Sequence, residues 1–143
     1  YHRLINPMKK IQPFVEKLTG LNNDMLLDKP VFNEIAEEIN RFTKGCIFVA
    51  HNVKFDFRVI RKEFLNIGQK FDRDLLCTIE LSKEVFPEIE SYSLGKLVSS
   101  LGIKINNRHR ADGDAKATLD LFLMIKSKME ADDLNRFIKN SDE

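Results

Sequence analysis

Two short stretches of the sequence place carboxylates beside imidazoles. In VAHNVKFDF, Asp56 follows an apolar run that ends at Ala50. In HRADGDA, His109 stands five positions before Asp114. Carboxylates and water are the ligands that Mg²⁺ and Mn²⁺ prefer, and an imidazole outside the coordination shell can act as a general base near neutral pH. Together the two stretches predict metal-assisted phosphoester hydrolysis.

Each of these residues also has an ordinary structural interpretation. Acidic residues near a helix N-terminus stabilise the helix by roughly 0.3 to 1 kcal/mol, which would account for Asp56. Asp112 or Asp114 would serve as a helix cap. His109 would be a solvated loop residue, and His51 a strand-end histidine bonded to backbone. The catalytic hypothesis therefore depends on the two stretches meeting in the fold.

A geometric condition applies to the second stretch. Residues five positions apart on a continuous helix lie about 140° apart, so His109 and Asp114 face one point only if His109 precedes the helix. The segment from Arg110 to Gly113 is a plausible break, with Gly113 providing conformational freedom. Two-metal sites ordinarily need more than two carboxylates, and only two are convincing here.

The elements that must position these residues alternate between strands and helices. Strands are expected in YHRLINP at the start, in CIFVAHN, which reads as buried on both faces, and in FDRDLLCT, whereas residues 7–30 form a connection. Helical periodicity is found over residues 31–42, 55–67, 78–86, 93–103, 113–129 and 132–140. This order predicts an α/β layered domain, in which strand ends and the following helix starts converge on one crevice.

Composition limits the possible classes of protein. A chain of 143 residues with 43% hydrophobic and 31% charged residues is one globular domain, without an apolar run long enough for a membrane span. Lys and Arg number 23 against 22 for Asp and Glu, so a nucleic acid would be held by a local patch or by metal. Cys46 and Cys77 read as reduced core thiols of a cytoplasmic protein, with one disulfide as the alternative.

Five strings in order resemble the DEDDh 3'-5' exonuclease superfamily, and most of all the epsilon proofreading subunit of bacterial DNA polymerase III. They are LTGLNNDML, DKPVFNEIAEEI, FVAHNVKFDFRVI, SYSLGKLVSSLGI and HRADGDAKATLDLF, within residues 1–129. The resemblance implies a ribonuclease H-like fold with a mixed sheet flanked by helices. It also implies hydrolysis at DNA 3' ends that releases nucleoside 5'-monophosphates, a two-metal site with Mg²⁺ or Mn²⁺, and a replicative polymerase subunit as partner.

The resemblance assigns roles to particular residues. Asp56 and Asp114 match metal-binding aspartates, and His109 matches the histidine that activates the attacking water. The groove for the 3'-terminal nucleotide would be lined by His51, Asn52 and Phe55, with Leu18 and Thr19 beside the base. For Phe55, an interpretation as the first core residue of its helix stays open. Phosphate contacts from Arg108, Arg110 and Lys116 are possible, although charged residues around a loop are usually only solvated.

The chain departs from the family at the first motif, an Asp-x-Glu pair on the first strand, which lies upstream of everything quoted. The nearest local candidate, Asp72-Arg73-Asp74, is interpreted as turn and cap chemistry. We therefore expect residues 1–143 to form a single exonuclease domain that is N-terminally incomplete and inactive alone. Loss of a central strand would leave backbone groups unpaired. Upstream residues, strand swapping and an inactive fragment are the three explanations.

Two alternative functions remain open at this point. The first is an RNA-directed 3'-5' exoribonuclease of the same superfamily, because the choice between DNA and RNA depends on contacts to the 2'-hydroxyl. The second is a catalytically inactive binding module. A polymerase, a helicase or a repair nuclease would each be a suitable context for the domain.

Overall fold

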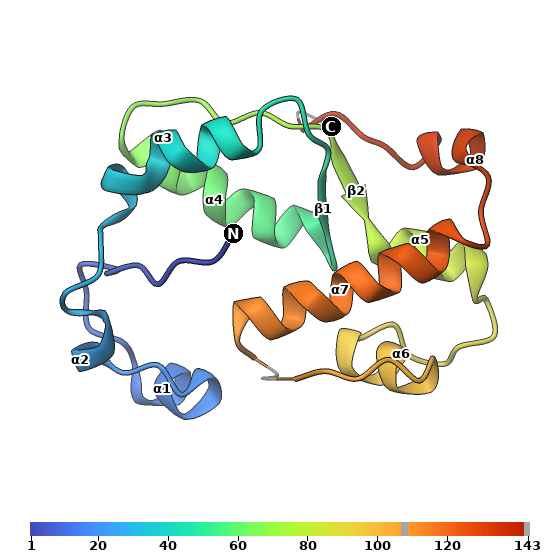
Figure 1. The fold of residues 1–143 in the computed structure, drawn as a ribbon, viewed down its shortest axis with the longest axis horizontal. Helices are drawn as coiled ribbons and strands as arrows, with labels where there is room; N and C mark the ends of the chain where they lie inside the picture. The colour runs from blue at the N-terminus through green and yellow to red at the C-terminus, as the bar shows by residue number, and fades with distance from the viewer. Residues whose placement is uncertain (107–108, 142–143) are drawn as a thin grey trace.

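A two-stranded parallel sheet lies between two groups of helices (Figure 1). The structure is a computed structural model that describes residues 1–106 and 109–141. Strand β1 (Phe48–Ala50) pairs with β2 (Leu75–Cys77), so that Val49 lies opposite Leu76. Because successive side chains of a strand point to opposite faces, Leu75 and Leu76 enter different hydrophobic clusters. The molecule is therefore layered as helix, sheet and helix, which confirms the α/β expectation.

The helices account for most of the regular structure. In chain order they are α1 (Pro13–Thr19), α2 (Asn23–Leu26), α3 (Phe32–Phe42), α4 (Val53–Asn66), α5 (Thr78–Val85), α6 (Leu94–Ser100), α7 (Ala111–Lys126) and α8 (Ala131–Asn135). The six helices expected from periodicity are all present, with shifted ends. Within the described residues, no helix is both long and apolar enough to cross a membrane.

Two expectations for the first thirty residues are wrong. Residues 1–7 form no strand. Asn6 N–H donates to the carbonyl of Pro30 at 2.9 Å, but this bond is not part of a series of strand hydrogen bonds. The stretch between Pro7 and Pro30 is not a plain connection, because it contains α1 and α2. Helix α1 begins with Pro13 at its first position and ends before Gly20, which has φ +69°. Proline at the start and glycine after the end are favourable for a helix, although the same residues also occur in loops.

One face of the sheet is covered by α3 and α4. Their shared cluster is aromatic: the rings of Phe64 and Phe71 stack with centroids 4.5 Å apart, and Phe32 meets Phe64 edge-on at 5.1 Å. This packing fixes α4 against both strands. Strand β1 itself is only half-buried, contrary to the expectation of burial on both faces, because in the described part of the chain it has a strand neighbour on one side.

The other face is covered by α5, α6 and α7, which lie together below the sheet in Figure 1. Leu81, Leu97, Leu121 and Ile125 are fully buried in the cluster between them. The two cysteines are free, but Cys46 is exposed and Cys77 partly buried, so the expectation of two core thiols is wrong for Cys46. The position of α7 across the sheet brings its first turns toward the end of β1.

Candidate active site

A cavity of about 790 Å³ lies between the end of β1 and one face of α7. Its wall comes from four elements: β1 with the turn after it, the first turn of α4, the start of α6, and α7. The lining residues are Phe48, Val49, Ala50, His51, Phe55, Asp56, Ser93, Leu94, Gly95, His109, Ala111, Asp114, Ala115, Thr118, Leu119 and Phe122. The cavity thus brings together the carboxylates and imidazoles that the two sequence stretches contain. We call it the reaction pocket below.

A sharp turn after β1 places three of these residues. Asn52 has the left-handed conformation, with φ 69° and ψ 55°, and α4 begins at the next residue. Asparagine tolerates this conformation better than most residues because its short side chain bonds locally. The turn puts His51 at the end of the strand and Phe55 and Asp56 on the first turn of the helix, all three facing the pocket.

His109 and Asp114 meet the geometric condition set by their spacing. His109 has φ 67° and precedes α7, whose flanking residue Arg110 is extended. The backbone N–H of Asp114 donates to the Arg110 carbonyl at 3.0 Å, which places Asp114 in the first turn of the helix. Neither Asp112 nor Asp114 is the N-cap, so that alternative is wrong. Both His109 and Asp114 line the reaction pocket.

The electrostatic state of the two aspartates suits a cation. Within the described residues, no ion pair involves Asp56 or Asp114. Burial of its carboxyl group raises the pKa of Asp56, because desolvation disfavours the charged form. Carboxylate oxygens are suitable ligands for Mg²⁺ or Mn²⁺. However, the described residues contain no group of three or more His, Cys, Asp or Glu side chains that could hold a metal ion. The donors therefore fit such an ion in kind but not in number.

His51 is held by protein groups on both sides of its ring. Its Nε2 lies 2.8 Å from the carbonyl oxygen of Tyr92, and its Nδ1 lies 2.9 Å from the hydroxyl of Thr78. Because a carbonyl only accepts, Nε2 carries the proton and donates, while Nδ1 accepts from Thr78. Burial lowers the pKa of His51, which favours this neutral form. The interpretation of His51 as a strand-end histidine bonded to backbone is therefore confirmed. In the pocket wall, its two hydrogen bonds fix the ring against Thr78 and Tyr92.

Of the remaining residues predicted to bind the nucleotide, one lines the reaction pocket and three do not. The side chain of Phe55 is 54% exposed and lines the reaction pocket, so its interpretation as a core residue is wrong. Asn52, Leu18 and Thr19 are not among the lining residues. Leu18 and Thr19 end α1, where the Thr19 hydroxyl donates to the Val15 carbonyl at 2.8 Å. The structure thus brings Phe55 into the pocket but not these other three.

Two of the candidate phosphate ligands, Arg110 and Lys116, do not line the pocket either. Arg110 precedes α7, and Lys116 forms an exposed ion pair with Asp120 at 3.6 Å. Arg108 lies outside the described residues.

The sequence did not predict the contribution of the start of α6, where Ser93 and Gly95 line the pocket. It also missed the stripe on α7, although helical spacing from Asp114 leads directly to Thr118 and Phe122.

Comparison with known proteins assigns the chain to a class. The family model of the RNase T exonucleases matches residues 1–122. The chain therefore belongs to this exonuclease family. This membership confirms the resemblance to the exonuclease superfamily.

Three similar proteins from different staphylococci share one name. The chain is 42% identical over 132 residues to the "3'-5' exonuclease DinG" of Staphylococcus saprophyticus, covering 92% of this chain and 15% of that protein. The proteins of the same name from Staphylococcus epidermidis and Staphylococcus aureus are each 40% identical over 131 residues, or 91% of this chain. This chain spans 14% of the first and 15% of the second. It thus corresponds to a small part of much longer relatives.

A solved structure shows the same fold. Exonuclease X, in complex with 5' overhanging duplex DNA, superimposes with a TM-score of 0.65 over 93% of this chain and 77% of that one, at 23% identity. The expected ribonuclease H-like exonuclease fold is thereby confirmed. A closer kinship to the epsilon proofreading subunit is not tested by these matches and stays a prediction.

Proposed function

We propose that this chain is the nuclease domain of a metal-dependent 3'-5' exonuclease that acts on DNA 3' ends. The observation that carries the proposal is the reaction pocket, because it is lined both by Asp56 from the start of α4 and by His109 and Asp114 from the start of α7. Family membership and the relatives named 3'-5' exonuclease support the same conclusion.

The residues of the pocket would have distinct roles in the reaction. Asp56 and Asp114 would hold Mg²⁺ or Mn²⁺ together with further carboxylates. When bound, such ions activate water and neutralise charge on the phosphate. His109 would accept the proton of the attacking water, since an imidazole is an effective base near neutral pH. Phe55, with its exposed ring, would pack against the terminal base.

The sheet supports the expectation that the domain is completed by a further strand. Phe48 N–H donates to the Asp74 carbonyl at 2.7 Å, so β1 bonds β2 through Phe48 and Ala50. Alternate residues of a parallel strand bond the same neighbour, and Val49 therefore directs its N–H and C=O to the opposite edge. In the described part of the chain no strand pairs with that edge. A strand carrying the Asp-x-Glu pair would fit there and supply the missing carboxylates.

The cellular context is proposed on narrower grounds. The name shared by the relatives favours a DinG-type protein over a polymerase subunit as the parent of this domain. A proofreading role with a polymerase partner stays a prediction without support from these relatives. Two free cysteines are what a reducing compartment such as the cytoplasm would maintain.

Polarity of digestion tests the proposal. The full-length protein, supplied with Mn²⁺, is expected to release a label from the 3' end of a DNA strand before any label from its 5' end. The released product should be a nucleoside 5'-monophosphate. Faster digestion of the matching RNA strand would favour the exoribonuclease alternative. Binding of the strand without any digestion would favour an inactive binding module.

A further inference from the structure

A second cavity, of about 440 Å³, lies on the opposite flank of α4 from Asp56. Its lining residues are Lys54, Phe57, Arg58, Arg61, Lys62, Leu65, Leu75 and Ser141. The walls come from α4, β2 and the segment that follows α8. We call this cavity the cationic groove. None of its residues belongs to the reaction pocket.

Positive charge is concentrated on this flank of α4. With 3.6 residues per turn, Lys54, Arg58, Arg61 and Lys62 fall within an arc of about 100°. The two acidic residues of α4, Asp56 and Glu63, fall outside that arc on the other flank. The whole chain has a formal net charge of only +1, so the positive charge on this flank is a local feature and does not reflect a basic protein overall.

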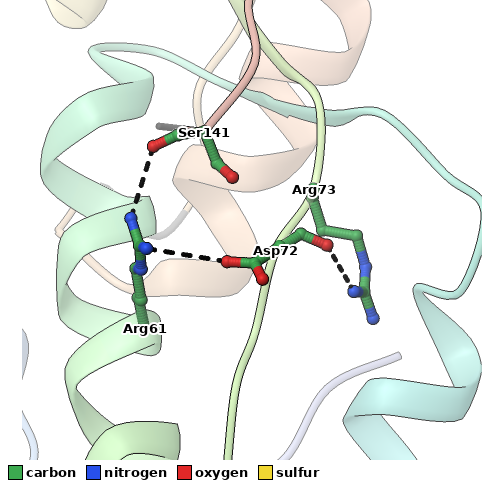
Figure 2. Close-up of polar contacts among 4 residues, drawn as sticks. All are labelled: Arg61, Asp72, Arg73 and Ser141. Carbon is green, nitrogen blue, oxygen red and sulfur yellow. Dashed lines mark hydrogen bonds and ion pairs between the residues drawn. The ribbon is translucent and has the colours of Figure 1, made fainter. Parts of the chain in front are cut away.

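One of the four cations has a structural role. Arg61 lies 3.7 Å from the Asp72 carboxylate and donates to the carbonyl of Ser141 at 3.3 Å, as Figure 2 shows. These contacts fix the segment after α8 against α4 and shape the groove. The neighbouring Arg73 is directed elsewhere, since it bonds the Asp72 and Thr43 carbonyls.

The other three cations have no carboxylate partner within the residues that the structure describes. Lys54, Arg58 and Lys62 are exposed, and none forms an ion pair within the described residues. The floor beneath them is apolar, with Phe57 and Leu75 buried. An apolar floor with a cationic rim matches a sugar–phosphate chain, which presents both apolar surface and regularly spaced negative charge.

The groove is connected to the reaction pocket across α4. The Arg58 guanidinium lies over the Phe55 ring, 5.9 Å from its centroid. Phe55 lines the reaction pocket, and Arg58 lines the cationic groove. A strand that leaves the reaction pocket past Phe55 would therefore meet Arg58 next, and Lys54 and Lys62 each lie one helix turn away from Arg58.

We propose that the cationic groove binds the sugar–phosphate backbone of the nucleic acid whose 3' end occupies the reaction pocket. This inference rests on the proposed function. From Lys54 to Lys62 the helix rises about 12 Å, so the groove is long enough to contact more than one phosphate of the same strand. An acidic protein segment would satisfy the charges equally well, but contact with the reaction pocket through Arg58 and Phe55 favours the substrate itself.

The test compares two substrates in the full-length protein. The K54Q/K62Q variant removes two charges from the groove, and K126Q/K128Q removes two from exposed positions that line neither cavity. The p-nitrophenyl ester of thymidine 5'-monophosphate requires only the reaction pocket, whereas a 30-nucleotide DNA strand also reaches the groove. Binding of a 3'-blocked strand, measured by fluorescence anisotropy at several salt concentrations, gives a readout that does not depend on activity.

For K54Q/K62Q we expect kcat/KM on the long strand to fall roughly tenfold at low salt, with ester hydrolysis changed less than about twofold. The slope of log affinity against log salt should become shallower by about 1.4, since each single-strand phosphate contact contributes about 0.7. K126Q/K128Q should resemble the unmodified protein in every assay.

Equal salt slopes for the two variants would overturn the inference, even with ester hydrolysis intact. If K54Q/K62Q instead loses only the association with an acidic protein segment, the groove is a protein-binding site and the inference is again wrong. A protein that hydrolyses neither substrate contradicts the proposed function, and the anisotropy slopes still decide the inference.

Discussion

At the scale of single residues, two of the three described non-glycine residues with positive φ lie next to or in the reaction pocket, and Met8 is the third. Asn52, with φ 69°, directly precedes α4, and His109, with φ 67°, lies two residues before α7. The first turn of each of these helices carries one of the two aspartates. The left-handed conformation costs an L-residue roughly 1 to 2 kcal/mol, so the surrounding packing must maintain it. Such strain is often found where a site needs an exact arrangement of side chains.

His109→Ala tests the role of the imidazole in the pocket. Removal of a general base typically lowers the rate by about 10² to 10⁴-fold, and we expect a fall of that order in kcat on a 3'-labelled strand. The matched control is His2→Ala, because His2 is exposed and lines neither cavity. Equal rates for His109→Ala and the control would exclude His109 as the base.

His51 predicts how stability depends on pH. Its pKa is lowered in the folded protein, so the unfolded state binds the proton more readily. The stabilisation from neutral His51 is therefore complete above the unfolded pKa of about 6.5 and is lost as pH falls below it. Urea unfolding followed by circular dichroism should give a lower free energy of unfolding at pH 5 than at pH 7.5. In His51→Gln this difference should be smaller, and an unchanged difference would assign the effect to other groups.

At the scale of elements, one face of α7 serves both the pocket and the core. Asp114, Thr118, Leu121 and Ile125 follow one another along this face at spacings of four, three and four residues. The first two line the pocket, whereas Leu121 and Ile125 are fully buried against α5 and α6. The buried part of the face therefore fixes the position of the part that lines the pocket, and a change in the core should alter the site through the helix.

Leu121→Ala measures the contribution of the buried part of this helix face. Leu121 is 0% exposed, and removal of a buried leucine side chain typically costs about 2 to 5 kcal/mol of folding free energy. Leu123→Ala is the control on the same helix, since Leu123 is 53% exposed and its loss should cost far less. Chemical denaturation of the two variants should separate them clearly, and similar midpoints would contradict this account of α7.

Periodicity predicted α3, α4 and α7 because each buries an apolar stripe, a property that the sequence displays directly. It failed for residues 1–7, where alternation suggested a strand, because a strand also needs a partner and the sequence does not show one. Asp56, Asp114 and His109 line one pocket, which is the condition that the catalytic hypothesis set, because two of them lie in first helix turns and His109 precedes one. Their roles stay predictions. The hydrogen bonds of His51 with the Thr78 hydroxyl and the Tyr92 carbonyl were not predictable, because they join groups that only the fold brings together.

At the scale of the whole molecule, the two edges of the sheet differ. The edge of β2 is partly covered, since Leu75 exchanges hydrogen bonds of 2.7 and 2.9 Å with Lys139. The edge of β1 faces the reaction pocket, and within the described residues no strand pairs with it. An unpaired edge next to a pocket with too few carboxylates is consistent with a domain that a further segment completes.

Hydrogen exchange at Val49 tests this completion. If a strand pairs with β1 in the full-length protein, the Val49 amide should exchange much more slowly there than in the 143-residue chain. The amide of Phe48 is the internal control, because it already bonds Asp74 and should be protected in both. Rapid exchange of Val49 in both proteins would show that the edge stays open.

The central claim is that the reaction pocket performs the hydrolysis, and two aspartates of one helix turn test it most directly. Asp114 lines the pocket, whereas Asp112 does not, although both lie in the first turn of α7. The measurement is the rate at which the full-length protein releases nucleoside 5'-monophosphate from a DNA 3' end in Mn²⁺. We predict that Asp114→Asn abolishes the release and that Asp112→Asn retains it. Equal rates for the two variants would show that the chemistry takes place elsewhere.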